Sequence, residues 1–567
     1  MIDGLTLKVS GGADMSNASR EVYEPKETYR GYNANGIAEQ QSRRSSSYSN
    51  ENVLTYIKKI GQHSLNVMVG SSLLYEENKT GSMTARDFIS DVYGYNNLDA
   101  GAQWDKPNTG RSKSTLLSGF GRINYVLMDK YLFTVTGRAD GSSKFGANNK
   151  WAFFPSFAAA WRINQEKFMK NIDWISNLKI RGSWGVTGNQ NIPAYSSPEK
   201  MNTYTYPIGG VTSVGIGAGN MPNPDLKWET TAITDIGIDL GVFNNRINFT
   251  ADYYYKKTTD LLWNISVPLT TGFGTVLKNI GSLQNKGLEL SLSADVLTGP
   301  FKWNTMLNWS TNKNKVLEIP GYIPTQQGTI SGHLKVNGSW LEPGLPVGVW
   351  NLLKTNGVMR TEKEWQDAAR VADSNFDKIG DMSFVDKNGD GKISFGEDRQ
   401  IVGDPNPDFI FGWTNNFSYK NFDLSVYING SVGNDIYNVL RAETNIVSAW
   451  GNQRAEVKDR WTANNPNGKY PRAHVLVNQN LLQSDYLIED GSFLRIQNVT
   501  LGYTFPKVSF LRSLRIYATA QNLLTITGYS GYNPEVNSQG QSNLQLGVDY
   551  NAYPTARSFI LGVNIGF

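Results

Sequence analysis

The sequence of 567 residues contains no cysteine and only three histidines. The absence of cysteine excludes disulfide bonds, thiolate nucleophiles and cysteine-ligated metal sites. The histidines, His63, His333 and His474, are widely separated in the sequence, which argues against a multi-histidine metal site. Lysine plus arginine (54) nearly balances aspartate plus glutamate (50), so the charge gives no electrostatic case for nucleic-acid binding.

Long hydrophobic runs are also missing. No stretch of about 18 apolar residues occurs, so no transmembrane helix is predicted. The opening residues, MIDGLTLKVSGG, lack the basic and apolar regions of a signal peptide and are predicted to lie within a strand. This hydropathy is compatible with a transmembrane β-barrel, because alternating lipid-facing and lumen-facing residues cancel in any average over a window.

Glycine and aromatic residues are abundant instead. The chain has 56 glycines, 28 tyrosines, 24 phenylalanines and 15 tryptophans. Runs rich in alanine, leucine, glutamate and lysine are scarce. This composition favours an all-β protein with many turns.

The closing segment, RSFILGVNIGF, alternates strictly enough to define two faces. One face carries Phe559, Leu561, Val563, Ile565 and Phe567; the other carries small or polar residues, with Ile560 as the exception. A wholly apolar outer face on a soluble edge strand is an aggregation hazard. In a membrane barrel such a face contacts lipid, so the segment predicts a transmembrane strand.

Similar strands occur in pairs that are joined by short turns. The turns are predicted at Asp129-Lys130, Asn244-Asn245, Thr298-Gly299, Lys420-Asn421 and around Pro506. Long polar segments separate the pairs, at residues 12–50, 77–114, 188–229, 358–408, 432–490 and 524–556. Short periplasmic turns and long outer loops alternate in this way in outer-membrane barrels. Counting back from Phe567 predicts about eighteen strands and places residues 358–408 outside the cell.

Tyrosine and tryptophan gather near the predicted strand ends. The positions are Trp161, Trp184, Trp228, Tyr253, Trp303, Trp309, Trp413 and Tyr503. They are predicted to form the aromatic girdles of a membrane barrel. The aromatic residues alone fit the core of a β-sandwich equally well.

One segment, DKNGDGKISFGED, has the spacing of an EF-hand calcium loop. Its predicted ligands are Asp386, Asn388, Asp390, the Lys392 carbonyl, Ser394 through a water, and Glu397. Gly391 permits the sharp turn, and Ile393 is the expected apolar anchor. The flanking segments are not amphipathic helices, so we expect a structural Ca²⁺ that stiffens a loop. The alternative is a turn rich in Asp, Asn and Gly that binds no metal.

Several long segments resemble the SusC/RagA family of TonB-dependent outer-membrane transporters. They include GRINYVLMDKYLFTVTGRADGSSKFGANNKWAFFPSFAAAWRI, LKIRGSWGVTGNQNIPAYSS, DKNGDGKISFGEDRQIVGDPNPDFIFGWTNNFSYKNFDLSVYINGS and PTARSFILGVNIGF, in the family's order. The resemblance implies a 22-stranded antiparallel transmembrane barrel with a plugged lumen. The chain is then the C-terminal barrel portion, expected to lack the signal peptide, the plug, the TonB-contacting segment and about four strands.

The resemblance also implies a function and partners. It implies import of oligosaccharides or peptides across a Gram-negative outer membrane, with a SusD-like surface lipoprotein as lid and the TonB complex acting through the plug. The calcium loop is then expected near the lid contact. No catalytic or cofactor-binding residues stand out, so an enzyme is not predicted. The alternatives are a secreted, calcium-stabilised carbohydrate-active or carbohydrate-binding protein and a plug-free porin or adhesin.

Overall fold

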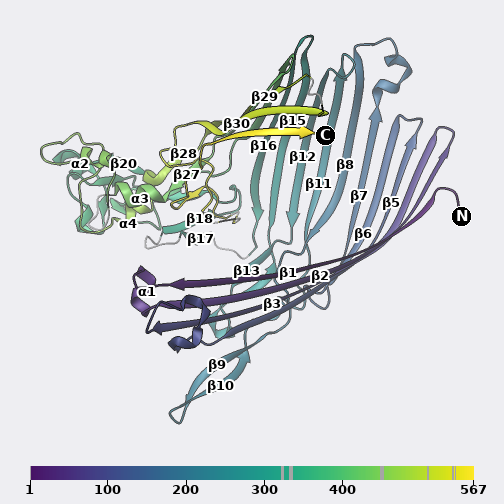
Figure 1. Ribbon diagram of the computed structural model, residues 1–567. Helices are drawn as coiled ribbons and strands as arrows, with labels where there is room; N and C mark the ends of the chain where they lie inside the picture. Colours follow the sequence, from purple (N-terminus) through teal and green to yellow (C-terminus); the bar gives the residue numbers. More distant parts are fainter. Residues whose placement is uncertain are drawn as a thin grey trace. The chain divides into compact units, whose positions relative to one another are not determined.

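Long antiparallel strand ladders dominate the fold, which is all-β as predicted (Figure 1). The computed structural model describes residues 2–320, 325–330, 336–446, 452–506, 510–538, 540, 542 and 544–567. The chain divides into two units. Unit 1 comprises residues 1–165, 181–234 and 257–281, and unit 2 comprises residues 166–180, 235–256 and 282–567.

Unit 1 is built on one antiparallel ladder in the order β1–β2–β3–β5–β6–β7. The strands are β1 (Leu5–Glu24), β2 (Ile37–Ile60), β3 (His63–Phe88), β5 (Asn108–Leu127), β6 (Tyr131–Ser142) and β7 (Trp151–Arg162). The short strand β4 (Gly101–Trp104) pairs with the end of β3. Helix α1 (Tyr29–Ala34) joins β1 to β2. Unit 1 also contains two separate hairpins. One pairs β9 (Met201–Ile208) with β10 (Val211–Ala218), and the other pairs β13 (Leu262–Ser266) with β14 (Thr275–Asn279).

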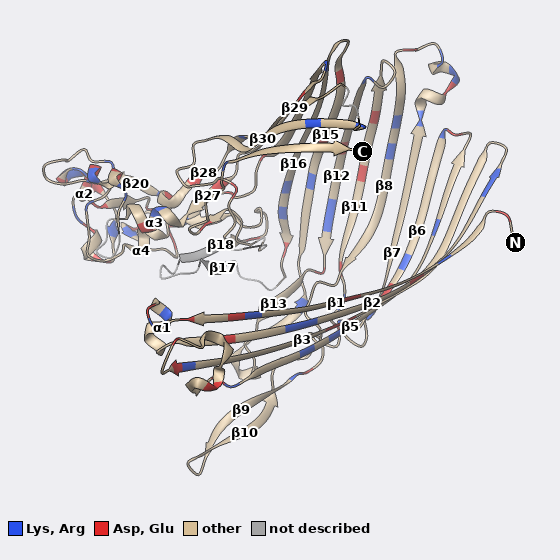
Figure 2. Cartoon of the chain, viewed as in Figure 1, with Lys and Arg blue, Asp and Glu red and all other residues tan. Residues whose placement is uncertain are grey.

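The first strands of unit 1 are much longer than predicted. β2 has 24 residues and pairs with β3 from Ile37↔Arg86 to Ile60↔His63 without a register shift. The expectation of loops at residues 12–50 and 77–114 is therefore wrong for most of their length. Both faces are polar there, and Figure 2 shows charged residues spaced along these strands. The hydrophobic alternation that identifies a strand is absent where both faces meet water.

Unit 2 holds a second antiparallel ladder, in the order β15–β16–β25–β26–β29–β30–β32. The strands are β15 (Ser282–Thr298), β16 (Phe301–Glu318), β25 (Phe409–Tyr419), β26 (Phe422–Val432), β29 (Phe493–Thr504), β30 (Ser513–Thr527) and β32 (Ser558–Gly566). The strands β8 (Ile175–Asn189), β11 (Glu229–Val242) and β12 (Ile247–Thr259) contain residues of both units.

The predicted short turns are confirmed. β5 ends at Leu127 and β6 begins at Tyr131; likewise β25 ends at Tyr419 and β26 begins at Phe422. Asp129 and Lys420 have positive φ angles of 55° and 53°, the left-handed backbone that tight hairpin turns require. The other predicted turns also fall between the ends of paired strands, and residues 507–509 beside Pro506 lie outside the described part.

The long segments of unit 2 contain only short elements. The strands are β17 (Thr325–Ile330), β18 (Val336–Leu341), β19 (Trp350–Leu352), β20 (Thr355–Val358), β21 (Arg370–Val371), β22 (Met382–Phe384), β23 (Lys392–Ile393), β24 (Gln400–Gly403), β27 (Asp435–Asn438), β28 (Ile488–Asp490) and β31 (Val548–Asp549). The helices are α2 (Glu362–Asp367), α3 (Val439–Asn445) and α4 (Gln479–Leu482). Among the residues described, every helix is too short or too polar to cross a bilayer.

Candidate functional site

The unit 2 ladder has one apolar and one polar face. Neighbouring residues in the strand register form rows across the sheet. One row on the apolar face is Leu292, Leu307, Trp413, Ile428, Ile496 and Leu524. The next row, on the polar face, is Ser291, Asn308, Gly412, Asn429, Arg495 and Thr525. The sheet therefore separates two chemically different environments.

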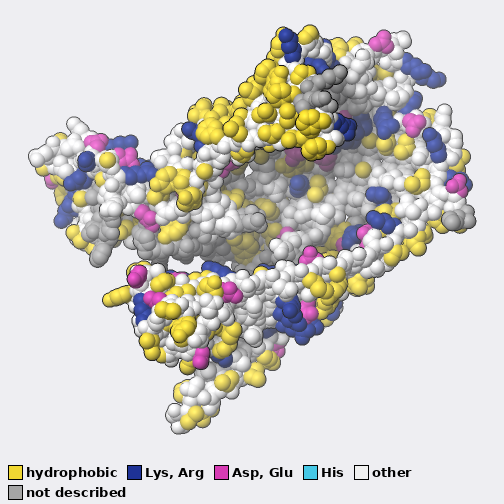
Figure 3. Space-filling model, in the orientation of Figure 1, with side chains coloured by type: hydrophobic (Ala, Val, Ile, Leu, Met, Phe, Trp, Pro, Cys, Tyr) yellow, Lys and Arg dark blue, Asp and Glu magenta, His cyan; other side chains and the backbone are white. Residues whose placement is uncertain are grey.

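The apolar face is exposed instead of being packed against a second layer. Leu561 is 85% exposed and Phe559 is 74% exposed, on the face predicted from the sequence of the last strand. Figure 3 shows hydrophobic side chains gathered over β29 and β30. A water-soluble protein rarely exposes so continuous an apolar surface, whereas a membrane strand presents such a surface to lipid.

The unit 1 ladder repeats this division of faces. One of its rows is Leu5, Tyr56, Val67, Ile123, Val135 and Phe157, and the adjacent row on the opposite face is Thr6, Thr55, Met68, Arg122, Thr136 and Ser156. One member of the predicted aromatic girdle does not belong to such a surface. Trp228 is buried with Phe145 and Phe154, and its indole Nε1 donates to the Lys150 carbonyl oxygen at 3.0 Å. For Trp228 the girdle prediction is wrong.

A cavity of about 910 Å³ lies against the polar face of unit 2. Strand residues that line it include Thr250, Asp252, Glu289, Ser291, Asn308, Ser310, Tyr427, Asn429 and Ser431. Apolar strand residues also line it, among them Leu290, Trp309, Ile410, Phe411 and Phe493. The segments between strands contribute Pro405, Pro407, Asn434, Ile436 and residues 534–537 and 546–547. A cavity of this size with hydroxyl, amide and carboxylate groups can hold a small polar ligand through hydrogen bonds.

Arg495 fixes one wall of the cavity. The side chain is nearly buried, and it donates to Thr525 Oγ1 at 2.9 Å, to Asn533 Oδ1 at 2.7 Å and to the Glu535 carboxylate. These contacts hold the segment around Asn533 and Glu535 against β29 and β30. Beside Arg495 in the strand register, Asn429 Oδ1 is buried and has no hydrogen-bond partner among the described residues. An unpaired buried oxygen costs free energy, which a donor on a ligand would recover.

The segments between the unit 2 strands share a hydrophobic core, which we call the loop cluster. It consists of Trp350, Leu352, Leu353, Val358, Val371, Met382, Phe384, Ile393, Tyr437, Val439, Ala442, Ile446, Leu481, Leu482, Leu487 and Val548. These residues come from all three long segments of unit 2. The predicted loops at 358–408, 432–490 and 524–556 therefore fold together as one body.

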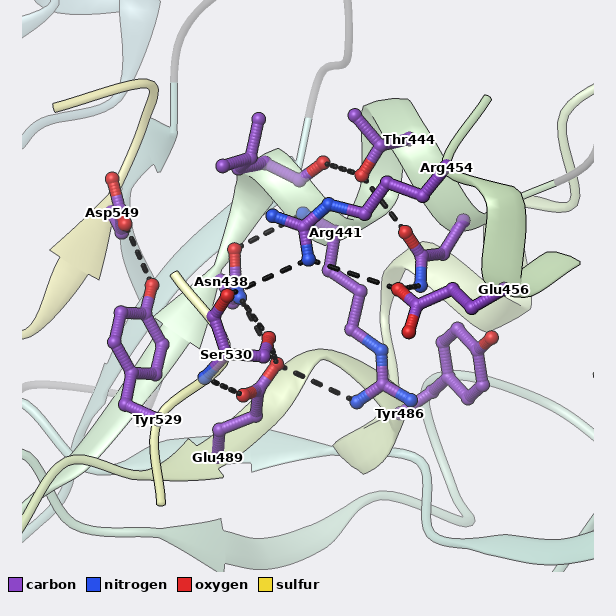
Figure 4. A network of polar contacts seen from close by, with 12 residues as sticks. Asn438, Arg441, Thr444, Arg454, Glu456, Tyr486, Glu489, Tyr529, Ser530 and Asp549 are labelled. Carbon is purple, nitrogen blue, oxygen red and sulfur yellow. Dashed lines mark hydrogen bonds and ion pairs between the residues drawn. The ribbon is translucent and has the colours of Figure 1, made fainter. Parts of the chain in front are cut away.

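A polar network adds to this cluster (Figure 4). Glu489 accepts hydrogen bonds from Asn438 Nδ2 at 3.0 Å and from the Ser530 amide at 2.9 Å, and it forms an ion pair with Arg441 at 3.6 Å. The Arg441 guanidinium lies 4.4 Å from the centroid of the Tyr486 ring. Burial raises the pKa of Tyr486 to about 12, so the phenol stays neutral beside this network at physiological pH.

The predicted calcium loop lies within the loop cluster. Asp386 accepts from the amides of Gly389 at 2.7 Å and Gly391 at 2.8 Å, which curls the loop around the carboxylate. Asn388 Nδ2 and Ser394 Oγ each lie 3.4 Å from Glu397 Oε2. Gly391 has a φ of +79°, and Ile393 is 5% exposed, as the sequence pattern predicts for the turn and the anchor.

The sequence missed the residue that closes this loop. Asp398 is fully buried and accepts from the amides of Lys387 and Ser394 at 2.9 and 2.7 Å. The loop thus brings Asp386, Asn388, Ser394 and Glu397 onto one curled segment, which fits an oxygen-ligated cation. However, the described residues contain no group of three or more His, Cys, Asp or Glu side chains placed to hold a metal ion. A cation would depend on amide, hydroxyl and carbonyl oxygens as well.

The two histidines that the structure describes each lie beside a polar side chain. His63 Nδ1 lies 2.7 Å from the Tyr125 hydroxyl, and His474 Nε2 lies 2.6 Å from the Asp381 carboxylate. His333 lies outside the described residues.

Comparison with known proteins adds independent information. The family described as "TonB dependent receptor-like, beta-barrel" matches residues 4–391. TonB-dependent receptor P3 of Formosa agariphila is 36% identical, over 100% of this chain and 57% of that protein. TonB-dependent receptor SusC of Bacteroides thetaiotaomicron is 33% identical, over 90% of this chain and 49% of that protein. A solved structure of the RagAB peptide transporter superposes with a TM-score of 0.83 and 25% identity, over 100% of this chain and 60% of that one. The chain spans about half the length of the curated relatives it matches.

Proposed function

This chain belongs to the TonB-dependent receptor-like β-barrel family and is a SusC/RagA-type outer-membrane protein. We propose that it forms part of the barrel wall and the outer loops of a nutrient importer. One observation carries the proposal. The paired strands expose a continuous apolar face on one side, and on the other side they border a cavity whose lining includes hydroxyl, amide and carboxylate groups. A transporter wall needs this combination because it meets lipid outside and a polar ligand inside. Closure into a 22-stranded barrel around a plug is part of the proposal.

The ligand that we propose is an oligosaccharide or a short peptide. Both are rich in hydrogen-bonding groups, which suits a cavity lined by Asn308, Asn429, Ser431 and Glu289. Tyr427 adds an aromatic surface for a sugar ring or an apolar side chain. Of the similar proteins, RagAB is described as a peptide transporter.

The proposed partners are a SusD-like surface lipoprotein, which covers the outer opening, and the TonB complex, which acts through a plug domain. The loop cluster supports the first of these. Its shared core gives the three long segments a defined surface that a lid can bind. The competing interpretation as a secreted carbohydrate-active protein is displaced by the family membership and the exposed apolar face.

The loop at residues 386–397 is proposed to bind Ca²⁺. Asp386, Asn388, Asp390, the Lys392 carbonyl, Ser394 and Glu397 would supply the oxygens, and the ion would supply charge that rigidifies the loop. The closed loop and the buried Ile393 anchor support this proposal.

The test is to purify the full-length transporter from outer membranes and to identify bound small molecules by native mass spectrometry. We expect an oligosaccharide or peptide in the wild-type protein. Replacing Asn308 and Asn429 by Leu removes hydrogen-bonding groups worth about 1 kcal/mol each, so ligand occupancy should fall roughly tenfold or more. The matched control is Asn564→Leu, on the polar face but outside the cavity lining. Equal ligand content in all three proteins would contradict a binding role for the cavity.

A further inference from the structure

The apolar face of the unit 1 ladder ends at a group of charged residues. On β3 the side chains of this face run from Leu65 through Val67 to Tyr75 without a charge. Ten residues of a strand extend about 33 Å, and a tilt of about 40° reduces this to roughly 25 Å, the height of the apolar band in outer-membrane barrels. The next two positions on this face are Glu77 and Lys79. Charged side chains therefore begin where the lipid-facing band ends.

Four cations and one carboxylate gather at this level, and we call them the cationic cluster. The register pairs Lys79 with Arg44 of β2 and with Arg111 of β5, and it pairs Glu77 with Lys113 of β5. All five side chains lie on the face of the apolar row described above, because an even number of residues separates each from that row's member on the same strand. Four positive charges and one negative charge leave a net charge of +3.

The single carboxylate leaves most of this charge uncompensated. Lys79 Nζ lies 3.7 Å from Glu77, and Arg111 contacts the same carboxylate. Arg44 Nε donates to Asn17 Oδ1 at 2.9 Å, which is a neutral partner. The Lys79 and Arg111 side chains are 50% and 57% exposed, so a further acceptor can reach them. A phosphate group suits such a row, because guanidinium groups bind its oxygens in pairs and lysine adds charge.

The cationic cluster lies toward the outer leaflet of the membrane. β3 begins after the short turn at Gly61-Gln62, and β5 ends at the short turn before Tyr131. Short turns are periplasmic in outer-membrane barrels, and the cluster lies at the opposite end of the apolar band. The rings of Tyr48 and Tyr75, with centroids 6.3 Å apart, lie between the band and the cluster. Aromatic rings occupy this level at the membrane interface.

We propose that the cationic cluster binds the phosphate groups of a lipid A-type glycolipid in the outer leaflet, with the acyl chains along the apolar band. Two observations favour this occupant: the net positive charge and its continuity with the lipid-facing band. Basic residues beside a membrane-embedded surface are typical of sites for anionic lipid head groups. An acidic protein or free phosphate would use the charges and leave the band uncovered. The site is on the outer wall, so the inference does not depend on which ligand is imported.

The experiment uses the full-length transporter, purified from outer membranes and exchanged into a neutral detergent. Native mass spectrometry measures the binding of diphosphoryl lipid A and of the same lipid after its phosphates have been removed. The test variant is Arg44→Gln plus Arg111→Gln. The matched control is Arg20→Gln plus Arg43→Gln, which removes two arginines from the opposite face of β1 and β2. All four arginines are exposed, so folding should be unaffected, and the heat-modifiable mobility of the barrel on gels checks this.

We expect the wild-type protein and the control to bind diphosphoryl lipid A at least tenfold more tightly than the dephosphorylated lipid. The test variant should lose this preference, because each cation near a membrane surface contributes about fivefold to the binding of an anionic lipid. Unchanged preference in the test variant overturns the inference, as does an equal loss in the control. If the wild-type protein binds both lipids equally, the acyl chains alone account for binding and the inference is overturned. Displacement of bound lipid A by millimolar inorganic phosphate would assign the cluster to free phosphate and overturn the lipid site. Each of these outcomes leaves the import function standing, since ligand content reports it separately.

Discussion

The strand ladder of unit 2 (β15, β16, β25, β26, β29, β30 and β32), which we call the wall, differs from the loop cluster in where its apolar side chains lie. In the wall, Leu561 and Phe559 are largely exposed, although they belong to a regular, well-paired strand. In the loop cluster, Trp350, Leu352 and Leu482 are completely buried, although they belong to short and irregular elements. Regular secondary structure and a buried core are therefore separate properties in this molecule. The apolar side chains of the wall contact the lipid of the membrane. The apolar side chains of the loop cluster are instead buried against one another in a protein core.

The largest expected effect tests the core of the loop cluster. Trp350→Ala should destabilise the cluster by about 3–5 kcal/mol, because it empties a fully enclosed site. Hydrogen exchange of residues 350–408 and 435–490 should rise, while exchange in the wall strands stays unchanged. The comparison partner is Leu561→Ala, which removes an exposed side chain and should leave exchange of the cluster as in wild type. Equal responses to the two changes would show that the two regions are not energetically distinct.

A charge on the apolar face of the wall should have the next largest effect. Ile428→Arg places a cation on the surface that we assign to lipid and should cost about 2–4 kcal/mol. Urea unfolding in lipid vesicles measures the loss. Thr414→Arg, on the polar face of the neighbouring strand, is the control and should cost much less. If the two arginines cost the same, the assignment of the faces fails.

Calcium should stabilise the loop cluster and leave the wall unaffected. For a dissociation constant of about 10⁻⁴ to 10⁻³ M, 10 mM Ca²⁺ adds roughly 1–3 kcal/mol. We expect the protease resistance of residues 350–408 and 435–490 to rise with Ca²⁺ and not with Mg²⁺. Glu397→Gln, which removes the bidentate carboxylate, should abolish the rise. An identical response in this variant would show that calcium acts elsewhere.

The smallest expected effect is a pH dependence confined to the loop cluster. Burial, with the nearby carboxylates of Asp490 and Asp404, raises the pKa of Asp435, while the Asp404 amide partly offsets this. A raised pKa in the folded state favours the protonated form, so this group's contribution to stability is lost as pH rises through the folded pKa. Asp435→Asn keeps an acceptor for the Asp404 amide and should flatten this dependence. Melting curves of both proteins across the acidic to neutral range measure it, and parallel curves would contradict the assignment.

The sequence predicted the strands that have one apolar, lipid-facing side. The terminal strand and the short turns have the alternation and turn residues that a membrane strand requires, and both are confirmed. The polar halves of β1 and β2 were predicted as loops, because neither face there carries an apolar pattern. The residues that line the cavity could not be predicted individually. They are far apart in the sequence, from Thr250 to Gly547, and only the register of several paired strands brings them together. Calcium binding at residues 386–397 was predicted from spacing and stays a prediction, and the buried Asp398 that closes this loop falls outside the ligand pattern.

The uninterrupted pairing of β2 with β3 has a mechanical consequence. A strand of 24 residues extends roughly 80 Å, whereas the hydrocarbon core of a bilayer is about 30 Å thick. The same hydrogen-bonded ladder therefore continues well past the lipid, with no bulge at which it can bend. At its far end, Ala38, Ala85 and Phe88 are packed together with Tyr23. A small tilt of the strands within the membrane would therefore displace this tip by several ångströms.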